Sequence, residues 1–278
     1  MILSNSHFDP DAPYWQDFLP FLDQLAGPDF PTCPQLNSLL PEGLCSAGGH
    51  TIRFVASDQL VDDAYEHRIY TTGQVSTRPG SWHDLFNAFI WMRYPCIKTA
   101  MNQLHYEAGA GFESGTRGRL RDALTLFDEC GVIVFSNRLD LLRALAERRW
   151  SDAFLSIDFR DSVGLSLSGH AMLEKYLSPY KAMTAKALLL QVSTEFMKLS
   201  RLEMIVHLDR EIANQLLTGQ LLNKPACLSP LPLAGVPGWW PQNEQQVDLF
   251  YCDTQVFRPA PAELTPVPVL NFHKRSKV

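Results

Sequence analysis

The chain has 278 residues, of which 46% are hydrophobic and 19% are charged, and its formal net charge at pH 7 is −6. This composition is typical of a globular protein and excludes a largely disordered one, and the length suits one large domain. The acidic balance argues against general binding of a nucleic acid such as duplex DNA through overall charge, although a local basic patch could still exist.

The chain carries no sign of a membrane or secreted protein. No apolar run reaches the ~18 residues of a membrane-spanning helix, so we expect no membrane partner. The first residues are neither basic nor followed by an apolar segment, unlike a secretory signal. The six cysteines are scattered without a CxxC pair, which predicts reduced thiols rather than a disulfide framework or a zinc cage. These features predict a cytoplasmic protein.

The sequence pattern of residues 1–50 predicts a segment that wraps around the core, and the predicted core begins at residue 51. Residues 1–50 are rich in proline and glycine around one helical pattern, Tyr14–Leu25, and we expect them to wrap a core built elsewhere. A β-branched alternation predicts a strand over Thr51–Ser57. Asp58 is the expected cap of a helix through Tyr65–Ile69.

Three further helices are predicted in quick succession. Ser81 is a favourable cap for a helix over Trp82–Arg93. Pro95 ends that helix and suits the first turn of a second one, over Cys96–Tyr106. The apolar spacing then predicts a third helix over Leu120–Glu129.

The second half of the core alternates strands with helices. Continuous apolar runs predict buried strands over Gly131–Phe135 and Lys186–Val192. Amphipathic patterns predict helices over Leu139–Trp150, over His170–Leu177 with Ser168 as its cap, and over Leu202–Leu217.

The C-terminal part is rich in proline and aromatic residues. Residues 224–262 predict an extended segment that packs on the core of residues 51–223, and residues 263–278 predict a disordered basic tail. The few, irregularly spaced strands do not suit a regular βαβ series. Together the elements predict an α+β fold, a helix-rich single domain with a small β-sheet.

Chemically versatile side chains concentrate between residues 65 and 129. The candidates for acid–base catalysis are His83, Asp84, His105 and Glu66. The candidates for binding a substrate are Arg78, Asn87, Lys98, Asn102 and Arg121. Residues four apart share one face of a helix, so the polar faces of the helices on either side of Pro95 could converge in one cleft.

This set of residues predicts an enzyme, a cytosolic hydrolase or transferase that acts on a small anionic or phosphate-bearing substrate. In this hypothesis His83 is a general base or a metal ligand, and Asp84 or Glu66 orients it. Arg78, Lys98 and Arg121 would hold the anion.

A divalent metal is a further possibility that the sequence leaves open. His83 and Asp84 could bind it together with Asp128. His170 and Glu174 lie four residues apart and offer a second pair of ligands. The spacing matches no known metal motif, so the sequence does not identify the metal.

A non-catalytic binding module is the alternative. The polar set would then be an internal network that fixes helix packing. A protein partner would bind the aromatic residues of the C-terminal segment, which are Trp239, Trp240, Phe250, Tyr251 and Phe257. These aromatics could equally pack against the body of the protein.

Several short motifs occur in an order that resembles a known family. They are YEHRI (65–69), WHDLFNAFIW (82–91), RDALTLFDE (121–129), GHAMLEKYLSP (169–179), LPLAGVPGWWP (231–241) and FYCDTQVFRP (250–259). With them the chain resembles the bacterial family called domain of unknown function 3025, from roughly residue 15 to residue 260. The resemblance implies a soluble protein of Gram-negative bacterial type. It assigns no activity and no catalytic residues.

Overall fold

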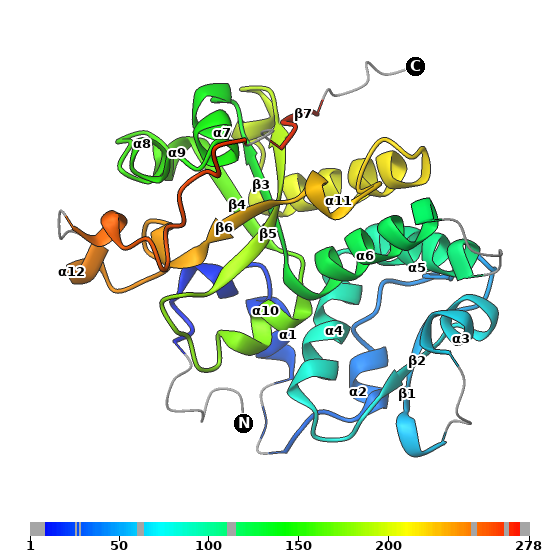
Figure 1. Ribbon diagram of the computed structural model, residues 1–278. Coiled ribbons are helices and arrows are strands. Elements are labelled where there is room, and N and C mark those ends of the chain that lie inside the picture. Colours follow the sequence, from blue (N-terminus) through cyan, green and yellow to red (C-terminus); the bar gives the residue numbers. More distant parts are fainter. Residues whose placement is uncertain are drawn as a thin grey trace.

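A mixed β-sheet with helices packed around it organises the chain (Figure 1). The structure is a computed structural model. It describes residues 9–25, 27, 29–59, 64–109, 115–245, 249–263 and 267–272, with the backbone alone at residues 59 and 115–117. Helices outweigh strands throughout the described residues, and the helix-rich α+β fold expected from the sequence is confirmed.

Strand β3 (Gly131–Ser136) lies at the centre of the sheet. It pairs antiparallel with β4 (Val163–Leu167) and parallel with β5 (Thr184–Gln191). Every residue of β3 is buried, which explains its continuous apolar sequence, since both faces of the strand are covered. Beyond β5, β6 (Ser229–Pro232) pairs antiparallel and β7 (Leu270–Asn271) parallel.

Four helices pack together beside one end of this sheet (Figure 1). They are α4 (Trp82–Arg93), α5 (Pro95–Gly109), α6 (Gly115–Cys130) and α10 (His170–Lys175). α10 contacts both α4 and α6, although it follows them by many residues in the sequence. The helix α4 has the predicted bounds, because the Oγ of Ser81 accepts the backbone N–H of Asp84 at its N-terminus.

A small unit lies against this group of helices. Its strands β1 (Arg53–Ala56) and β2 (Gln74–Thr77) pair in parallel, and α3 (Tyr65–Thr72) connects them. The helix α2 (Cys33–Asn37) contacts β1. The predicted cap of α3 is wrong: Ala64 occupies the N-cap position, and Asp58 lies in a separate 3-10 turn.

The remaining helices cover other parts of the sheet and of α5. The helices α7 (Leu139–Ala146), α8 (Trp150–Phe154) and α9 (Phe159–Ser162) lie toward the opposite end of the sheet from α10 (Figure 1). The single helix predicted over Leu139–Trp150 is therefore wrong. Arg148 breaks it, because its φ of 56° is incompatible with a continuing right-handed helix.

The long helix α11 (Arg201–Leu217) packs along α5. Ser200 caps it through a reciprocal capping box with Glu203. Near the C-terminus, α12 (Gln242–Gln245) is a single turn. Among the described residues, no helix combines the length and apolar character needed to cross a membrane.

The N-terminal segment packs tightly on the core, but not as the continuous helix that the sequence predicts. A 3-10 turn (Pro13–Trp15) is followed by α1 (Leu19–Gln24). Pro20 fits the first turn of α1, whereas it would interrupt a helix that began at Tyr14. Trp15 is completely buried, so this segment contributes to the hydrophobic core.

Three strands of the main sheet have no clear signal in the sequence. β4 is short and contains Gly164, and β6 contains two prolines, which sheets accept mainly on edge strands. β7 lies in the segment predicted to be a disordered tail, and residues 273–278 of that tail lie outside the described residues. Pairing with neighbouring strands, rather than local propensity, stabilises these elements.

Candidate functional site

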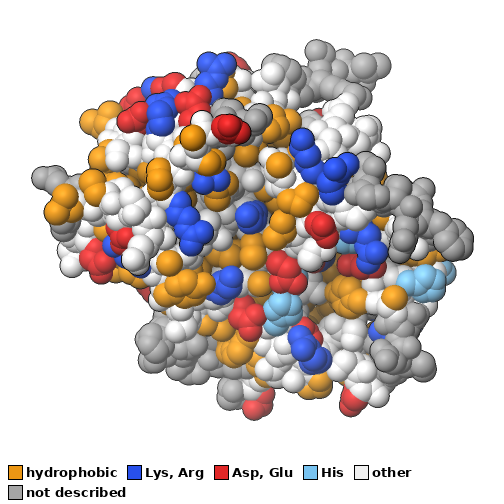
Figure 2. All heavy atoms as spheres, in the orientation of Figure 1, with side chains coloured by type: hydrophobic (Ala, Val, Ile, Leu, Met, Phe, Trp, Pro, Cys, Tyr) orange, Lys and Arg blue, Asp and Glu red, His pale blue; other side chains and the backbone are white. Residues whose placement is uncertain are grey.

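A polar cavity of about 530 Å³ is lined by residues of α3, α4, α5, α6 and α10. Acidic, basic and histidine side chains gather over the junction of α4, α6 and α10 (Figure 2). Seven of the nine predicted site residues line the cavity: Glu66, Arg78, His83, Asp84, Asn87, His105 and Arg121. Lys98 and Asn102 do not line it, because both are buried behind its wall.

A second, larger cavity of about 780 Å³ lies against β1 and β2. Phe30, Phe54 and Leu85 belong to its lining, and no histidine or carboxylate is found among its described lining residues. It shares Arg78 with the polar cavity. Because acid–base groups concentrate in the smaller cavity, we assign the candidate site to that one.

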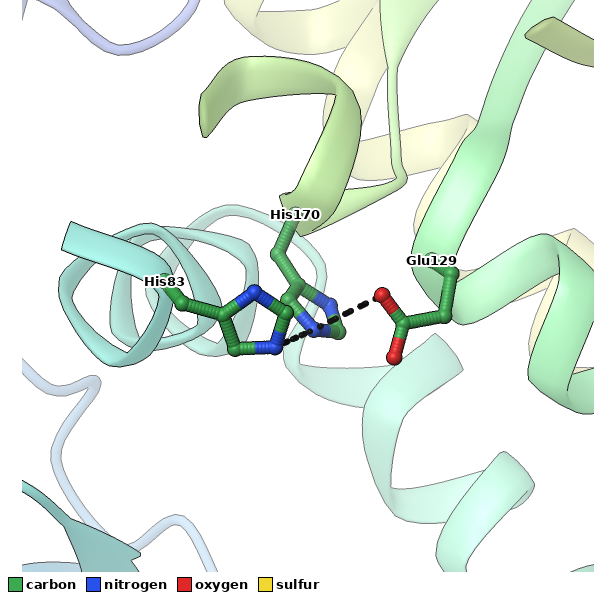
Figure 3. Close-up of side chains that lie close together, drawn as sticks. All are labelled: His83, Glu129 and His170. Atoms are coloured by element: carbon green, nitrogen blue, oxygen red, sulfur yellow. Dashed lines mark hydrogen bonds and ion pairs between the residues drawn. The ribbon is translucent and has the colours of Figure 1, made fainter. Parts of the chain in front are cut away.

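Two histidines and a carboxylate from three different helices meet in the polar cavity (Figure 3). His83 lies on α4, His170 begins α10, and Glu129 lies at the end of α6. The Nε2 atoms of the two histidines are 3.0 Å apart, and His170 Nε2 lies 3.5 Å from Glu129 Oε2. The sequence indicates neither that His170 joins His83 nor that Glu129 faces them, because these contacts are made only by the tertiary fold.

Each of these imidazole rings has a carboxylate at its other nitrogen. The Nδ1 of His83 is hydrogen-bonded to Glu174 Oε2 at 2.9 Å. The Nδ1 of His170 lies 3.8 Å from Asp128 Oδ2, which is too far for a hydrogen bond, and it has no hydrogen-bond partner among the described residues. The sequence also pairs His170 with Glu174, four residues further on, as possible ligands of one metal. Glu174 instead contacts His83. It lies where the sequence suggested Asp84 or Glu66 as the carboxylate that orients this ring.

Asp84 is held by Arg78 instead. The Nε and Nη2 atoms of Arg78 donate to the two carboxylate oxygens of Asp84 at 2.9 and 2.8 Å, and the backbone N–H of Arg78 donates as well. Burial alone would raise the pKa of Asp84, but the bonds from Arg78 hold it below its usual value. Asp84 therefore stays ionised and fastens the loop before α4, while Arg78 is already neutralised.

Lys98 lies beneath the cavity floor with a side chain only 5% exposed. Its Nζ donates to Asp128 Oδ1 at 2.6 Å and to Asn87 Oδ1 at 3.0 Å. Asn87 in turn donates to the hydroxyl of Tyr65. Burial would raise the pKa of Asp128, but the charge of Lys98 holds it below its usual value. Lys98 thus supports the site from below rather than contacting an anion in the cavity.

Asn102 supports the site in a similar way. Its Nδ2 donates to the carboxylate of Glu66 at 2.6 Å and to the backbone carbonyl of Glu66 at 2.9 Å. Asn102 is almost completely buried, whereas Glu66 lines the cavity. The amide of Asn102 therefore fixes the carboxylate of Glu66 in one orientation at the cavity wall.

Two further predicted residues, Arg121 and His105, are also available to a ligand. Arg121 is exposed on the cavity rim, and no ion partner is found for it among the described residues. His105 lines the cavity, and burial lowers its pKa below the usual histidine value. Burial also lowers the pKa of His170. Both imidazoles are therefore neutral at pH 7 and able to accept a proton or bind a cation.

The family model described as protein of unknown function (DUF3025) matches residues 52–261, which include every residue of the polar cavity. No curated protein and no solved structure matches the chain. Since the family model covers most of the sequence, the chain belongs to this family of proteins of unknown function, DUF3025.

Proposed function

We propose that the chain is a hydrolase or transferase that acts on a small anionic or phosphate-bearing substrate in the polar cavity. The observation that carries this proposal is the pair of facing imidazoles, His83 and His170, with the carboxylate of Glu174 bonded to the other ring nitrogen of His83. Such a carboxylate fixes the tautomer of the ring and leaves the opposite nitrogen as a base.

His83 is the residue of this pair that a substrate can reach. Its side chain is 33% exposed, whereas that of His170 is 6% exposed. With Nδ1–H donated to Glu174, the Nε2 of His83 can take a proton from a water molecule. The water oxygen then bonds to the phosphorus or carbonyl carbon of the substrate, and the leaving group departs with the electron pair of the broken bond. The proton on His83 returns to that leaving group.

The rest of the cavity suits a small charged ligand. A volume of about 530 Å³ is in the range of small-molecule sites. Arg121, exposed on the rim, can pair with a phosphate or carboxylate through its planar guanidinium. His105 and Glu66 line the cavity and can form hydrogen bonds to other parts of the substrate.

The aromatic residues of the C-terminal segment offer little surface to a protein partner, which favours the enzyme over the binding module. Trp239, Phe250, Tyr251 and Phe257 are all buried. Trp240 is partly buried, and its indole N–H donates to Glu244. Packing against the body of the protein accounts for these side chains.

We place this activity in the bacterial cytoplasm. The six cysteines are all free thiols in the fold, as expected in a reducing compartment. The family resemblance implies a bacterial protein.

Turnover of a substrate panel tests this proposal. The panel contains phosphate monoesters, phosphate diesters, carboxylate esters and amides, and the purified protein should hydrolyse at least one class. The variant His83→Ala should lower kcat by about 10²- to 10⁴-fold, the usual contribution of a general base, with an unchanged melting temperature. His207→Ala, on the exposed side of α11, is the matched control and should retain full activity. Inactivity of the wild type on every class, or full activity of His83→Ala, would refute the proposal.

A further inference from the structure

Two of the three distances among the side chains of His83, His170 and Glu129 match those between ligands of one metal ion. Zinc binds histidine nitrogen at about 2.0–2.1 Å and carboxylate oxygen at about 2.0–2.2 Å. Two such atoms on one ion lie about 3.0 Å apart at a right angle and about 3.4 Å apart at the tetrahedral angle. The observed distances are 3.0 Å between the two Nε2 atoms and 3.5 Å from His170 Nε2 to Glu129 Oε2, and all three ligand atoms lie within 4.8 Å of one another.

The carboxylates behind the histidines supply the second argument. Glu174 can only accept a hydrogen bond when ionised, so it favours a hydrogen on the Nδ1 of His83, 2.9 Å away. Asp128 lies 3.8 Å from the Nδ1 of His170, beyond hydrogen-bond distance, and its negative charge favours a hydrogen on that nitrogen as well. Both Nε2 atoms then present lone pairs toward each other. A histidine that binds a metal characteristically donates its other N–H to a carboxylate, which orients the ring and makes it a better ligand.

Charge gives a third, independent argument. Glu66, Asp84, Asp128 and Glu129 line the cavity, and Glu174 is bonded to His83. The cations around them are Arg78, Lys98 and Arg121. Among the described residues, five carboxylates against three cations leave an excess of two negative charges beside the two histidines. A divalent cation would neutralise this excess and lower the repulsion that an anionic substrate meets.

We propose that His83, His170 and Glu129 bind one divalent first-row transition ion, with zinc the best match, and that Glu174 holds the imidazole of His83 in place. Two histidines and one carboxylate are a ligand set of catalytic zinc sites, which leave a coordination position open. All three ligands line the polar cavity, so the open position would face its interior and could take a water molecule. This inference rests on the proposed function only for what the ion does there, because binding itself needs no turnover. With an ion bound, the lone pair of His83 Nε2 would be a ligand rather than a base, and the ion would take over from His83 the activation of the water molecule.

This ligand set differs from the one that the sequence suggests. Asp84 is committed to Arg78, and Asp128 is committed to Lys98. His170 and Glu129 take their places. They reach His83 only because the end of α6 and the start of α10 lie beside each other.

Zinc binding to the full-length protein tests the inference. The protein is dialysed against a chelator, freed of it and titrated with zinc by calorimetry. We expect one equivalent of zinc per chain, with at least 100-fold weaker binding in His83→Ala and in His170→Ala. The matched control His207→Ala should bind zinc like the wild type. Binding of no stoichiometric zinc by the wild type, or unchanged affinity in His83→Ala, would overturn the inference.

The design separates this inference from the proposed function and from folding. His83 is partly exposed, so its variant remains informative if the buried His170→Ala variant fails to fold. Stoichiometric zinc binding without turnover of any substrate would refute the proposed activity and support the metal site. Full turnover by protein that binds no zinc would overturn the metal site and leave the activity standing.

Discussion

The backbone N–H of Gly169 donates a hydrogen bond of 2.9 Å to the carbonyl of Gly131, where β4 ends and β3 begins. This contact is very close. A Cβ atom on Gly169 would lie 2.3 Å from the nitrogen of Gly131 and 2.6 Å from the carbonyl oxygen of Glu129. Only glycine fits there, and the close approach brings His170, the next residue, against Glu129.

We expect Gly169→Ala to disturb both stability and the site. The added methyl group meets backbone atoms that cannot rotate away, so the free energy of unfolding should fall by about 1–3 kcal/mol, as in other overpacked sites. Zinc affinity should fall too, because His170 must shift. Urea denaturation and calorimetric titration measure the two effects.

Gly118→Ala in α6 is the control for this substitution. A Cβ atom there meets nothing within 4 Å, and alanine in a helix interior stabilises it by about 0.5–1 kcal/mol relative to glycine. If Gly169→Ala behaved like Gly118→Ala, the close approach of the two glycines would not hold in solution.

Glu174 offers a test of the orienting carboxylate. In Glu174→Gln the side chain keeps its size but loses its charge, and its amide can turn a hydrogen toward His83 Nδ1. We expect zinc affinity to fall by about 10- to 100-fold, the usual effect of losing such a partner, with the melting temperature unchanged. Glu203→Gln on α11 is the control. Unchanged affinity in Glu174→Gln would show that Glu174 does not position His83.

The buried ion pair of Lys98 and Asp128 should show strong coupling. Lys98→Met leaves the carboxylate without its partner and should lower the free energy of unfolding by about 3–5 kcal/mol. The double variant with Asp128→Asn removes both charges and should cost less than the two single variants added together, by about 0.5–3 kcal/mol. Denaturation of chelator-treated protein measures the cycle without a contribution from bound metal. Strict additivity would contradict the pairing.

The raised pKa of the buried Asp209 should make the stability of the protein depend on pH. It accepts the backbone N–H groups of Cys96 and Ile97 at the start of α5, yet burial raises its pKa above the usual aspartate value. The folded state then binds a proton more tightly than the unfolded state. Its contribution to stability is therefore complete below the unfolded pKa, about 3.9, and falls as the pH rises toward the folded pKa.

Comparison with Asp209→Asn isolates this contribution. The difference in free energy of unfolding, wild type minus variant, should decrease from about pH 4 upward and become constant above the folded pKa. Urea denaturation of both proteins over this range measures it. A difference that increases with pH would mean that the hydrogen bonds to Asp209 outweigh its burial.

Trp239 and Trp240 should differ sharply despite being neighbours. Trp239 is buried, with its ring edge-on to Tyr14 and Tyr176 at centroid distances of 5.8 and 6.0 Å. Trp239→Ala should lower the free energy of unfolding by about 3–5 kcal/mol. Trp240→Ala, at a partly exposed side chain, should cost within about 1 kcal/mol. Equal and small effects would instead favour an exposed aromatic surface for a partner.

The local sequence pattern was sufficient to predict the helices and strands that local interactions largely stabilise. The helix α4 has the predicted bounds, because Ser81 caps it and Pro95 prevents its continuation. Strand β3 is recognisable from its continuous apolar run, which suits a strand covered on both faces. The strands β6 and β7 are not recognisable, since their hydrogen bonds to β5 stabilise sequences with little strand propensity of their own.

The same distinction applies to the candidate site. Helical spacing by itself determined that His83 and Asn87 share one face of α4, and both line the polar cavity. Only the tertiary structure decided which residues meet them: Glu174 is 91 residues from His83 in the sequence, and His170 is 87 residues away. A periodic pattern specifies directions around one helix axis, whereas contacts between helices depend on how the core packs and on close backbone approaches such as that of Gly131 and Gly169.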